Sequence, residues 1–268
     1  MGRFSALAVL ACLICVSLVS CDDTREATLR YRLIATVEID GQKVEGSTVM
    51  EMHYKNIRSD PHFLDYFIQL ITHINPRVTL TEHAAEALIL DLKGRGTVFI
   101  LPSVRTDEFA AFHEVCLLLT LGIENKLHGL TREDMRQISN AKGRMPLQLL
   151  RPEERRPDYP KGFVSKYPAM VTFRNEKDPR TIEDVDPENM ERRFPGVRLL
   201  NVEIEVTDAP LTRVLTKRLP WLMTVEKNET LEREPVGSMR SPREKPVVRL
   251  IRQIDFFGRG WERMLQVK

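Results

Sequence analysis

Cysteine and glycine are both scarce in this sequence of 268 residues, which contains four cysteines and 13 glycines. So few cysteines exclude a small disulfide-stabilised scaffold, and so little glycine excludes collagen-like and low-complexity chains. The charges nearly cancel, with 40 basic against 38 acidic side chains and a net charge of +2. The composition therefore lacks the positive charge typical of nucleic-acid binding, and we expect no nucleic acid as partner.

The familiar catalytic motifs are missing as well. The sequence has no Gly-x-Ser-x-Gly elbow and no glycine-rich phosphate loop followed by Lys-Ser or Lys-Thr. His113-Glu114 begins like the helix of a zinc protease, but Leu117 stands where that motif needs its second histidine. We therefore assign no catalytic residue, no cofactor and no metal site from the sequence.

One long apolar run is present, at the N-terminus. Arg3 supplies a positive charge before residues 4–19, which carry no charge. A cytosolic core helix would have a polar face, whereas this run contains only Ser5 and Ser17 as polar residues. At about 16 residues it is also short of the roughly 20 that a membrane-spanning helix needs. Residues 1–20 are therefore predicted to be a secretory signal peptide.

The apolar run ends in Leu18-Val19-Ser20-Cys21, which resembles the lipobox of bacterial lipoprotein signal peptides. The resemblance implies that Cys21 receives a diacylglyceryl group, that the signal peptide is cut before it, and that the new amino group is acylated. Residues 21–27 would then form an acylated tether to the membrane. Two or three acyl chains hold a protein at a bilayer stably, whereas one chain binds marginally.

Two aspartates, Asp22 and Asp23, follow the cysteine. An aspartate directly after the acylated cysteine resembles the inner-membrane retention signal of enteric bacteria. The resemblance implies a location at the periplasmic face of the inner membrane, with the outer membrane as the alternative. Cys12 and Cys15 leave with the signal peptide, so Cys116 is the one remaining thiol. Its apolar helical surroundings predict a buried inert thiol rather than a nucleophile.

Alternating apolar and polar residues predict two β-hairpins. Residues 29–39 and 44–54 alternate on either side of Asp40-Gly41, a strong two-residue turn signal. Residues 87–92 and 97–101 flank a second turn that contains two glycines.

The remaining elements are predicted from helical spacing, caps and further alternation. Helices are expected at 60–73, 106–122, 131–140 and from Asp208 to before Pro220; strands are expected at 170–173, 200–206 and 247–257. Hairpins interspersed with helices, without a βαβ rhythm, predict an α+β fold. We expect antiparallel hairpins packed with a few helices in a single globular domain, residues 28–222.

Two charged stretches allow more than one interpretation. The acidic stretch suggests either a calcium loop or a solvated loop, and the prolines within it favour the second, with a helical turn around 188–192. Its acids are Asp178, Glu183, Asp184, Asp186 and Glu188. Residues 213–268 hold 13 basic against seven acidic side chains, which suits either anionic lipid or an ordinary solvated surface. We expect residues 223–268 to be a basic, partly ordered C-terminal segment.

Several segments together resemble a family of uncharacterised proteobacterial lipoproteins and related small secreted proteins. The resemblance rests on residues 31–54, 167–173, 178–187, 202–208 and 217–222, the last containing Leu219-Pro220-Trp221-Leu222. It implies a class and a location, and it carries over no catalytic residue.

The leading hypothesis is a membrane-anchored cell-envelope lipoprotein that acts by binding an envelope protein partner. The alternative is a periplasmic hydrolase with a site assembled from dispersed residues such as His53, His113 or the acidic stretch. An assembly factor or an immunity-like protein is a third possibility, which the sequence does not separate from the first.

Overall fold

A long antiparallel hairpin dominates the structure. The computed structural model describes residues 26–56, 79–102, 116–123, 130–148, 167–225, 231 and 253–257. Strands β1 (Glu26–Ile39) and β2 (Gln42–Asn56) pair along their whole length. The turn residues Asp40 and Gly41 have φ of 49° and 80°, as a two-residue hairpin turn requires. The first predicted hairpin is therefore confirmed, although β1 starts two residues inside the predicted tether, because Glu26 and Ala27 pair with β2.

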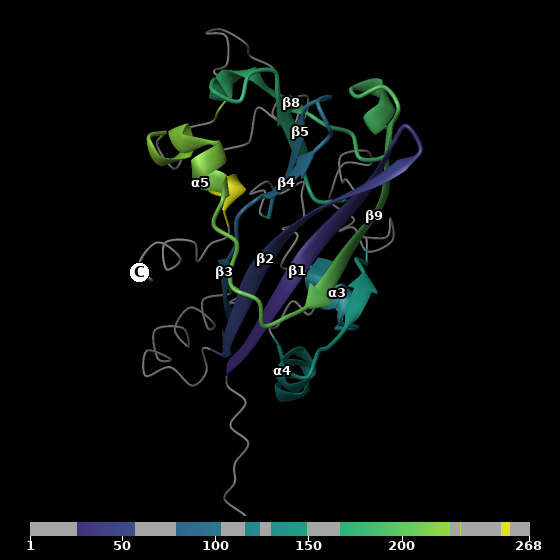
Figure 1. Ribbon diagram of the computed structural model, residues 1–268. Helices are drawn as coiled ribbons and strands as arrows, with labels where there is room; N and C mark the ends of the chain where they lie inside the picture. The colour runs from purple at the N-terminus through teal and green to yellow at the C-terminus, as the bar shows by residue number, and fades with distance from the viewer. Residues whose placement is uncertain are drawn as a thin grey trace, which may run out of the picture.

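The hairpin forms the centre of a five-stranded antiparallel sheet with the order β3-β2-β1-β9-β6 (Figure 1). Strand β9 (Val197–Val206) pairs with β1 and confirms the strand predicted over 200–206. Strands β3 (Thr79–Ala84) and β6 (Arg144–Pro146) were not predicted. Both are short edge strands with few large apolar residues, so their sequences carry little alternation.

A second, four-stranded antiparallel sheet has the order β4-β5-β7-β8. Strands β4 (Leu88–Asp91) and β5 (Thr97–Ile100) are the second predicted hairpin, and β7 (Met170–Phe173) confirms the strand predicted over 170–173. Strand β8 (Ile182–Asp184) corrects the interpretation of the acidic stretch as loop, because Ile182 is buried and the strand pairs with β7. The short helix η4 (Met190–Arg192) is the helical turn expected after that stretch.

The main core lies between the two sheets. Alternate residues of β1 from Ala27 to Ile39 are buried, and they share one apolar cluster with Leu88, Leu90 and Ile100 of the smaller sheet. At Gly46 the strand β2 passes so close to β4 that a Cβ atom would lie 2.9 Å from the carbonyl oxygen of Ile89. The sheets therefore meet backbone to backbone there.

A second apolar cluster covers the other face of the smaller sheet. Phe99 and Phe173 pack in it against residues of three short helices. These helices are α5 (Leu215–Arg218), η5 (Pro220–Met223) and η8 (Gln253–Phe256). The half-buried Trp221 ring packs edge-on against Phe173, with the centroids 5.6 Å apart. Strands β5 and β7 are consequently buried on both faces.

The helices are only partly as predicted. Helix α4 (Arg132–Ser139) is confirmed, with a capping box between Thr131 and Asp134. Helix α3 (Cys116–Thr120) lies within the helix predicted over 106–122, and Cys116 is buried as expected. The remainder of that prediction, and the helix at 60–73, lie outside the described residues.

Two predictions near the C-terminus are wrong. The helix expected from Asp208 begins only at Leu215, because residues 207–214 run in an irregular conformation to reach β2. The end of the strand expected over 247–257 is the short helix η8, and only Phe257 makes a β-bridge, to Glu86. Most of the predicted C-terminal segment, residues 223–268, lies outside the described residues.

Two antiparallel sheets with a few helices in one domain confirm the α+β class. Among the described residues no helix is long and apolar enough to cross a membrane.

Candidate functional site

The residues of the predicted anchor, Cys21, Asp22 and Asp23, lie outside the described residues, as does His113. His53 of β2 is partly exposed on the outer face of the five-stranded sheet, the face directed away from the main core. Its Nδ1 lies 3.0 Å from Thr28 Oγ1, and its Nε2 lies 3.8 Å from a carboxylate oxygen of Glu26. The arrangement is a row of hydroxyl, imidazole and carboxylate along two neighbouring strands.

The acidic stretch lies on the other sheet, so the structure does not bring it together with His53. Asp178 and Asp186 each accept a hydrogen bond from a backbone N–H two residues further on, at 3.0 Å. Glu183 forms ion pairs with Arg174 and Arg193. In the described part of the chain no group of three potential metal ligands is found. In this stretch, Asp178 and Asp186 thus hold turns, and Glu183 pairs with arginines.

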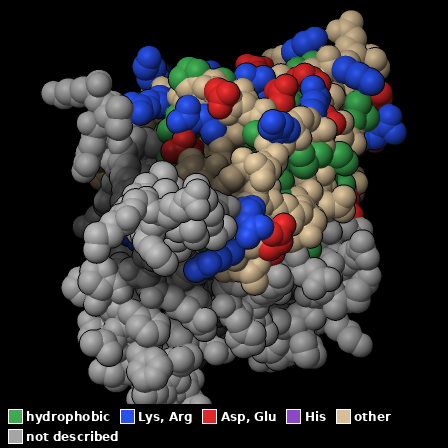
Figure 2. All heavy atoms as spheres, turned by 90° about the horizontal axis from the view of Figure 1, so that it is seen from below, with side chains coloured by type: hydrophobic (Ala, Val, Ile, Leu, Met, Phe, Trp, Pro, Cys, Tyr) green, Lys and Arg blue, Asp and Glu red, His purple; other side chains and the backbone are tan. Residues whose placement is uncertain are grey.

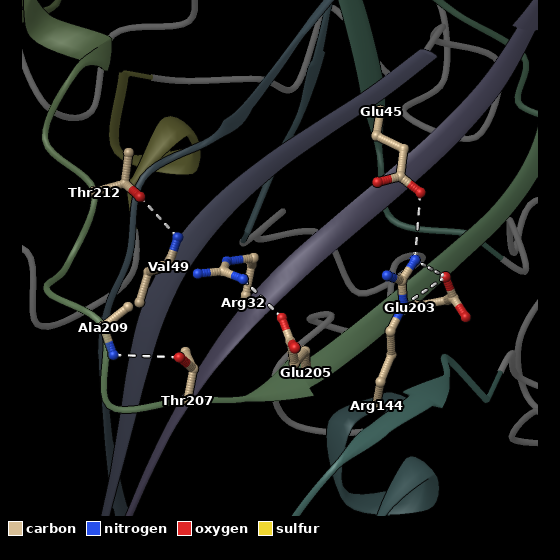
Figure 3. Close-up of polar contacts among 9 residues, drawn as sticks. All are labelled: Arg32, Glu45, Val49, Arg144, Glu203, Glu205, Thr207, Ala209 and Thr212. Atoms are coloured by element: carbon tan, nitrogen blue, oxygen red, sulfur yellow. Dashed lines mark hydrogen bonds and ion pairs between the residues drawn. The ribbon is translucent and has the colours of Figure 1, made fainter. Parts of the chain in front are cut away.

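Charged side chains on the outer face of the five-stranded sheet pair across strands (Figure 3). Arg32 of β1 contacts Glu205 of β9 at 2.7 Å. The Arg144 guanidinium of β6 contacts Glu203 at 2.6 Å and Glu45 of β2 at 3.4 Å, so that it bridges over β1. The hydrogen bond to Glu203 is the main cause of the raised pKa of Arg144. This face neutralises its own charges and presents no field of one sign.

Residues 207–214, which we call the strap, cross this face from β9 to the edge of β2 (Figures 1 and 3). The Thr207 amide donates to the carbonyl of Arg30 at 3.0 Å. Thr212 makes two hydrogen bonds with Val49: its hydroxyl accepts from the Val49 amide at 2.8 Å, and its own amide donates to the Val49 carbonyl at 3.2 Å. The strap thus connects the five-stranded sheet to the helices that cover the smaller sheet.

The end of the strap is held by a buried carboxylate. Glu86 is 3% exposed and accepts hydrogen bonds from the backbone N–H groups of Val214 at 2.8 Å and Leu215 at 3.1 Å. Burial raises the pKa of Glu86, while these two hydrogen bonds and the charge of Arg213 oppose the rise. The carboxylate satisfies the first donors of α5, which a four-residue helix cannot satisfy itself.

A buried polar pair lies on the inner face of the five-stranded sheet. The Tyr31 hydroxyl and His83 Nε2 are 3.0 Å apart, and their rings stack with centroids 6.3 Å apart. Burial is the main cause that raises the pKa of Tyr31 well above its ordinary value, and the proximity of Tyr54 raises it further. His83 was not predicted as a core residue, because β3 was not predicted. No other feature of the sequence indicates that its ring is buried. The pair is sealed inside the protein, which suits a structural role.

Three turns from distant parts of the sequence meet at the end of the hairpin opposite the start of β1. We call residues 38–43, 91–96 and 192–198 the distal tip. The Asp40 amide donates to the carbonyl of Gly196 at 3.1 Å, and Arg95 donates to both the Asp40 carboxylate and the Pro195 carbonyl. Lys93 Nζ donates to Gln42 Oε1 at 3.3 Å. Sequence reasoning found the two hairpin turns but not their meeting, since no local pattern encodes it.

Comparison with known protein families, with curated proteins and with solved structures finds no match to this chain. A functional conclusion therefore depends on the residues and the geometry described above.

Proposed function

We propose that this protein is a bacterial envelope lipoprotein, held at a membrane by lipids on Cys21, which acts by binding another envelope protein. The resemblance of Leu18–Cys21 to a lipobox supports the anchor. The location that follows from Asp22 and Asp23 is the periplasmic face of the inner membrane, with the outer membrane as the alternative.

The observation that carries the proposal is the short distance between the anchor and the fold. Strand β1 begins at Glu26, five residues after Cys21. A fully extended chain of that length spans no more than about 18 Å. The start of β1 and the end of β2, where Lys55 Nζ lies 3.6 Å from Glu26, would therefore stay close to the lipid headgroups.

The described surface on the side where β1 begins carries side chains of both charges. Figure 2 views the molecule from below, the side on which β1 begins in Figure 1, and its described surface mixes acidic and basic side chains. That described surface has no large field of one sign, so it would neither repel nor strongly attract lipid headgroups. We infer that the lipids on Cys21, rather than this described surface, supply the membrane affinity.

The hydrolase alternative has one observation in its favour, the row of Thr28, His53 and Glu26. A hydroxyl, an imidazole and a carboxylate are the groups of nucleophilic catalysis. Here they form cross-strand neighbours on an open sheet face, and His53 Nε2 is 3.8 Å from Glu26, beyond hydrogen-bond distance. We therefore rank this function second.

The anchor is tested by Cys21→Ser. The variant should lose metabolic labelling with a radioactive fatty acid, and the protein should either leave the membrane fraction or accumulate as an uncleaved precursor. Cys116→Ser is the matched control, because it removes the buried thiol and leaves the lipobox intact. Normal processing and membrane retention of Cys21→Ser would exclude the lipoprotein proposal.

A further inference from the structure

We propose that the distal tip is a docking surface for an acidic patch of a soluble protein in the same compartment. The proposal deepens the proposed function, on which it rests: it names the part of the molecule that binds and the chemistry of the partner. Three independent features of the tip support it, namely its rigidity, its charge and its distance from the anchor.

The tip is rigid, because each of its three turns is tied to another. Arg95 joins the second hairpin to the first through Asp40, and it joins both to the turn before β9 through the Pro195 carbonyl. Asp40 and Gly196 are joined by a backbone hydrogen bond, and the Phe194 ring is buried beneath Arg193. Loops held on a rigid scaffold are the usual carriers of binding residues, because little conformational entropy is lost when they dock.

The tip also carries a local excess of positive charge. It contains six basic residues, Lys43, Lys93, Arg95, Arg192, Arg193 and Arg198, against three acidic residues, Glu38, Asp40 and Asp91. Asp40 and Glu38 are engaged by Arg95 and Arg198.

Three cations of the tip remain available to a partner. Within the described part of the chain, Lys43 and Arg192 form no ion pair, and the Lys93 ammonium bonds only an amide oxygen. All three side chains are exposed. An acidic surface is the complementary partner, since like-charged or apolar surfaces would leave these ammonium and guanidinium groups without a counter-charge.

The distance of the tip from the proposed anchor favours a protein over a lipid as the partner that binds there. The tip lies at the far end of β1, whose 14 residues span about 45 Å. When the hairpin stands upright on the membrane, a cation at that distance from the start of β1 is several Debye lengths from the headgroups around Cys21. In that orientation a soluble protein can reach the tip, whereas the lipids that hold Cys21 cannot.

The probe is a fluorescein-labelled peptide of ten glutamates, with ten glutamines as the neutral reference, and binding is followed by fluorescence anisotropy. The full-length protein is used in a non-ionic detergent at low ionic strength. Wild type should bind the glutamate peptide, and affinity should fall as salt is raised. Lys43→Glu with Lys93→Glu should weaken binding at least tenfold.

The matched control is Lys142→Glu with Lys217→Glu, which changes the net charge equally through two exposed lysines outside the tip. It should weaken binding less than twofold. Equal weakening in the two double variants, or equal binding of the glutamine peptide, would overturn the proposal. So would tighter binding of the wild type to phosphatidylglycerol added to the detergent as mixed micelles, lost in the tip variant, because the tip would then be a lipid site.

This experiment is independent of the anchor. Failure of the Cys21→Ser prediction would remove the lipoprotein assignment and leave the peptide measurements unchanged. Conversely, a tip that does not discriminate between the peptides would remove the docking surface and leave lipidation unaffected.

Discussion

The buried Glu86 carboxylate is the residue in which burial and hydrogen bonding oppose each other most directly. Removal from water disfavours the charged form, while the amides of Val214 and Leu215 favour it. Since the pKa of Glu86 is raised, burial is the larger effect. The group therefore holds the strap in place at a net electrostatic cost, which a neutral acceptor would avoid.

A raised pKa in the folded state determines the sign of the pH dependence. Folding favours the protonated form of Glu86, so its contribution to stability is greatest below the pKa of the unfolded chain. That contribution is lost as pH rises through the higher folded pKa. Urea unfolding of the wild type and of Glu86→Gln over a range of pH should show this difference: the wild type loses stability as pH rises through the folded pKa, and the variant, which does not titrate, lacks this decline.

Glu86→Ala is the matched comparison at the same position. Removing the acceptor leaves two backbone N–H groups without a partner, which should lower the free energy of unfolding by about 1–3 kcal/mol. Equal stability of the wild type and Glu86→Ala at pH 7 would show that the hydrogen bonds to Val214 and Leu215 contribute nothing to stability.

At the scale of the element, the long hairpin needs two glycines for different reasons. Gly41 has a φ of 80°, and a Cβ atom added there would meet no other atom within 4 Å, so its requirement is one of backbone conformation alone. Gly46 has no such φ, but the Ile89 carbonyl leaves no room for a side chain. The first glycine permits the turn, and the second permits the two sheets to pack.

The turn is tested by Gly41→Val. A β-branched residue at this φ is strained, so the free energy of unfolding should fall by about 1–3 kcal/mol. Ser47→Val is a suitable control, because the site is an exposed position of β2 and should change stability by no more than about 0.5 kcal/mol. Thermal unfolding followed by circular dichroism measures both. A wild-type melting temperature for Gly41→Val would show that the turn tolerates a side chain.

At the scale of the whole molecule, the order of the parts along the long axis carries the functional proposal. The proposed anchor, Cys21, precedes β1 in the sequence, the charged sheet face and the strap lie along the hairpin, and the interlocked turns lie at its far end (Figure 1). A partner bound at the tip would therefore be held about 45 Å from the start of β1.

The choice of membrane is tested by Asp22→Ser with Asp23→Ser. If these aspartates retain the protein, wild type should band with the inner membrane in a sucrose gradient and the double variant should move to the outer membrane. Both residues precede the described fold, so stability should be unchanged. Banding of the wild type with the outer membrane would exclude retention while leaving the lipid anchor in place.

The sequence by itself determined the features that depend on neighbouring residues. The hairpins follow from alternation beside turn residues such as Asp40-Gly41, and α4 follows from the Thr131–Asp134 capping box. Each of these signals acts within a few residues, so a single window of sequence contains both the cause and the result. The predicted anchor at Cys21 is likewise a local pattern.

Only the tertiary structure decided the features that join distant segments. Residues 182–184 form strand β8 because they pair with the edge of β7. Residues 207–214 form the strap instead of the predicted helix because hydrogen bonds through Thr212 and Glu86 hold that segment against β2 and α5. The meeting of Asp40, Arg95 and Gly196 joins three turns that lie far apart along the chain. Such contacts form after the sheets have packed, and their energy depends on geometry that no local pattern contains.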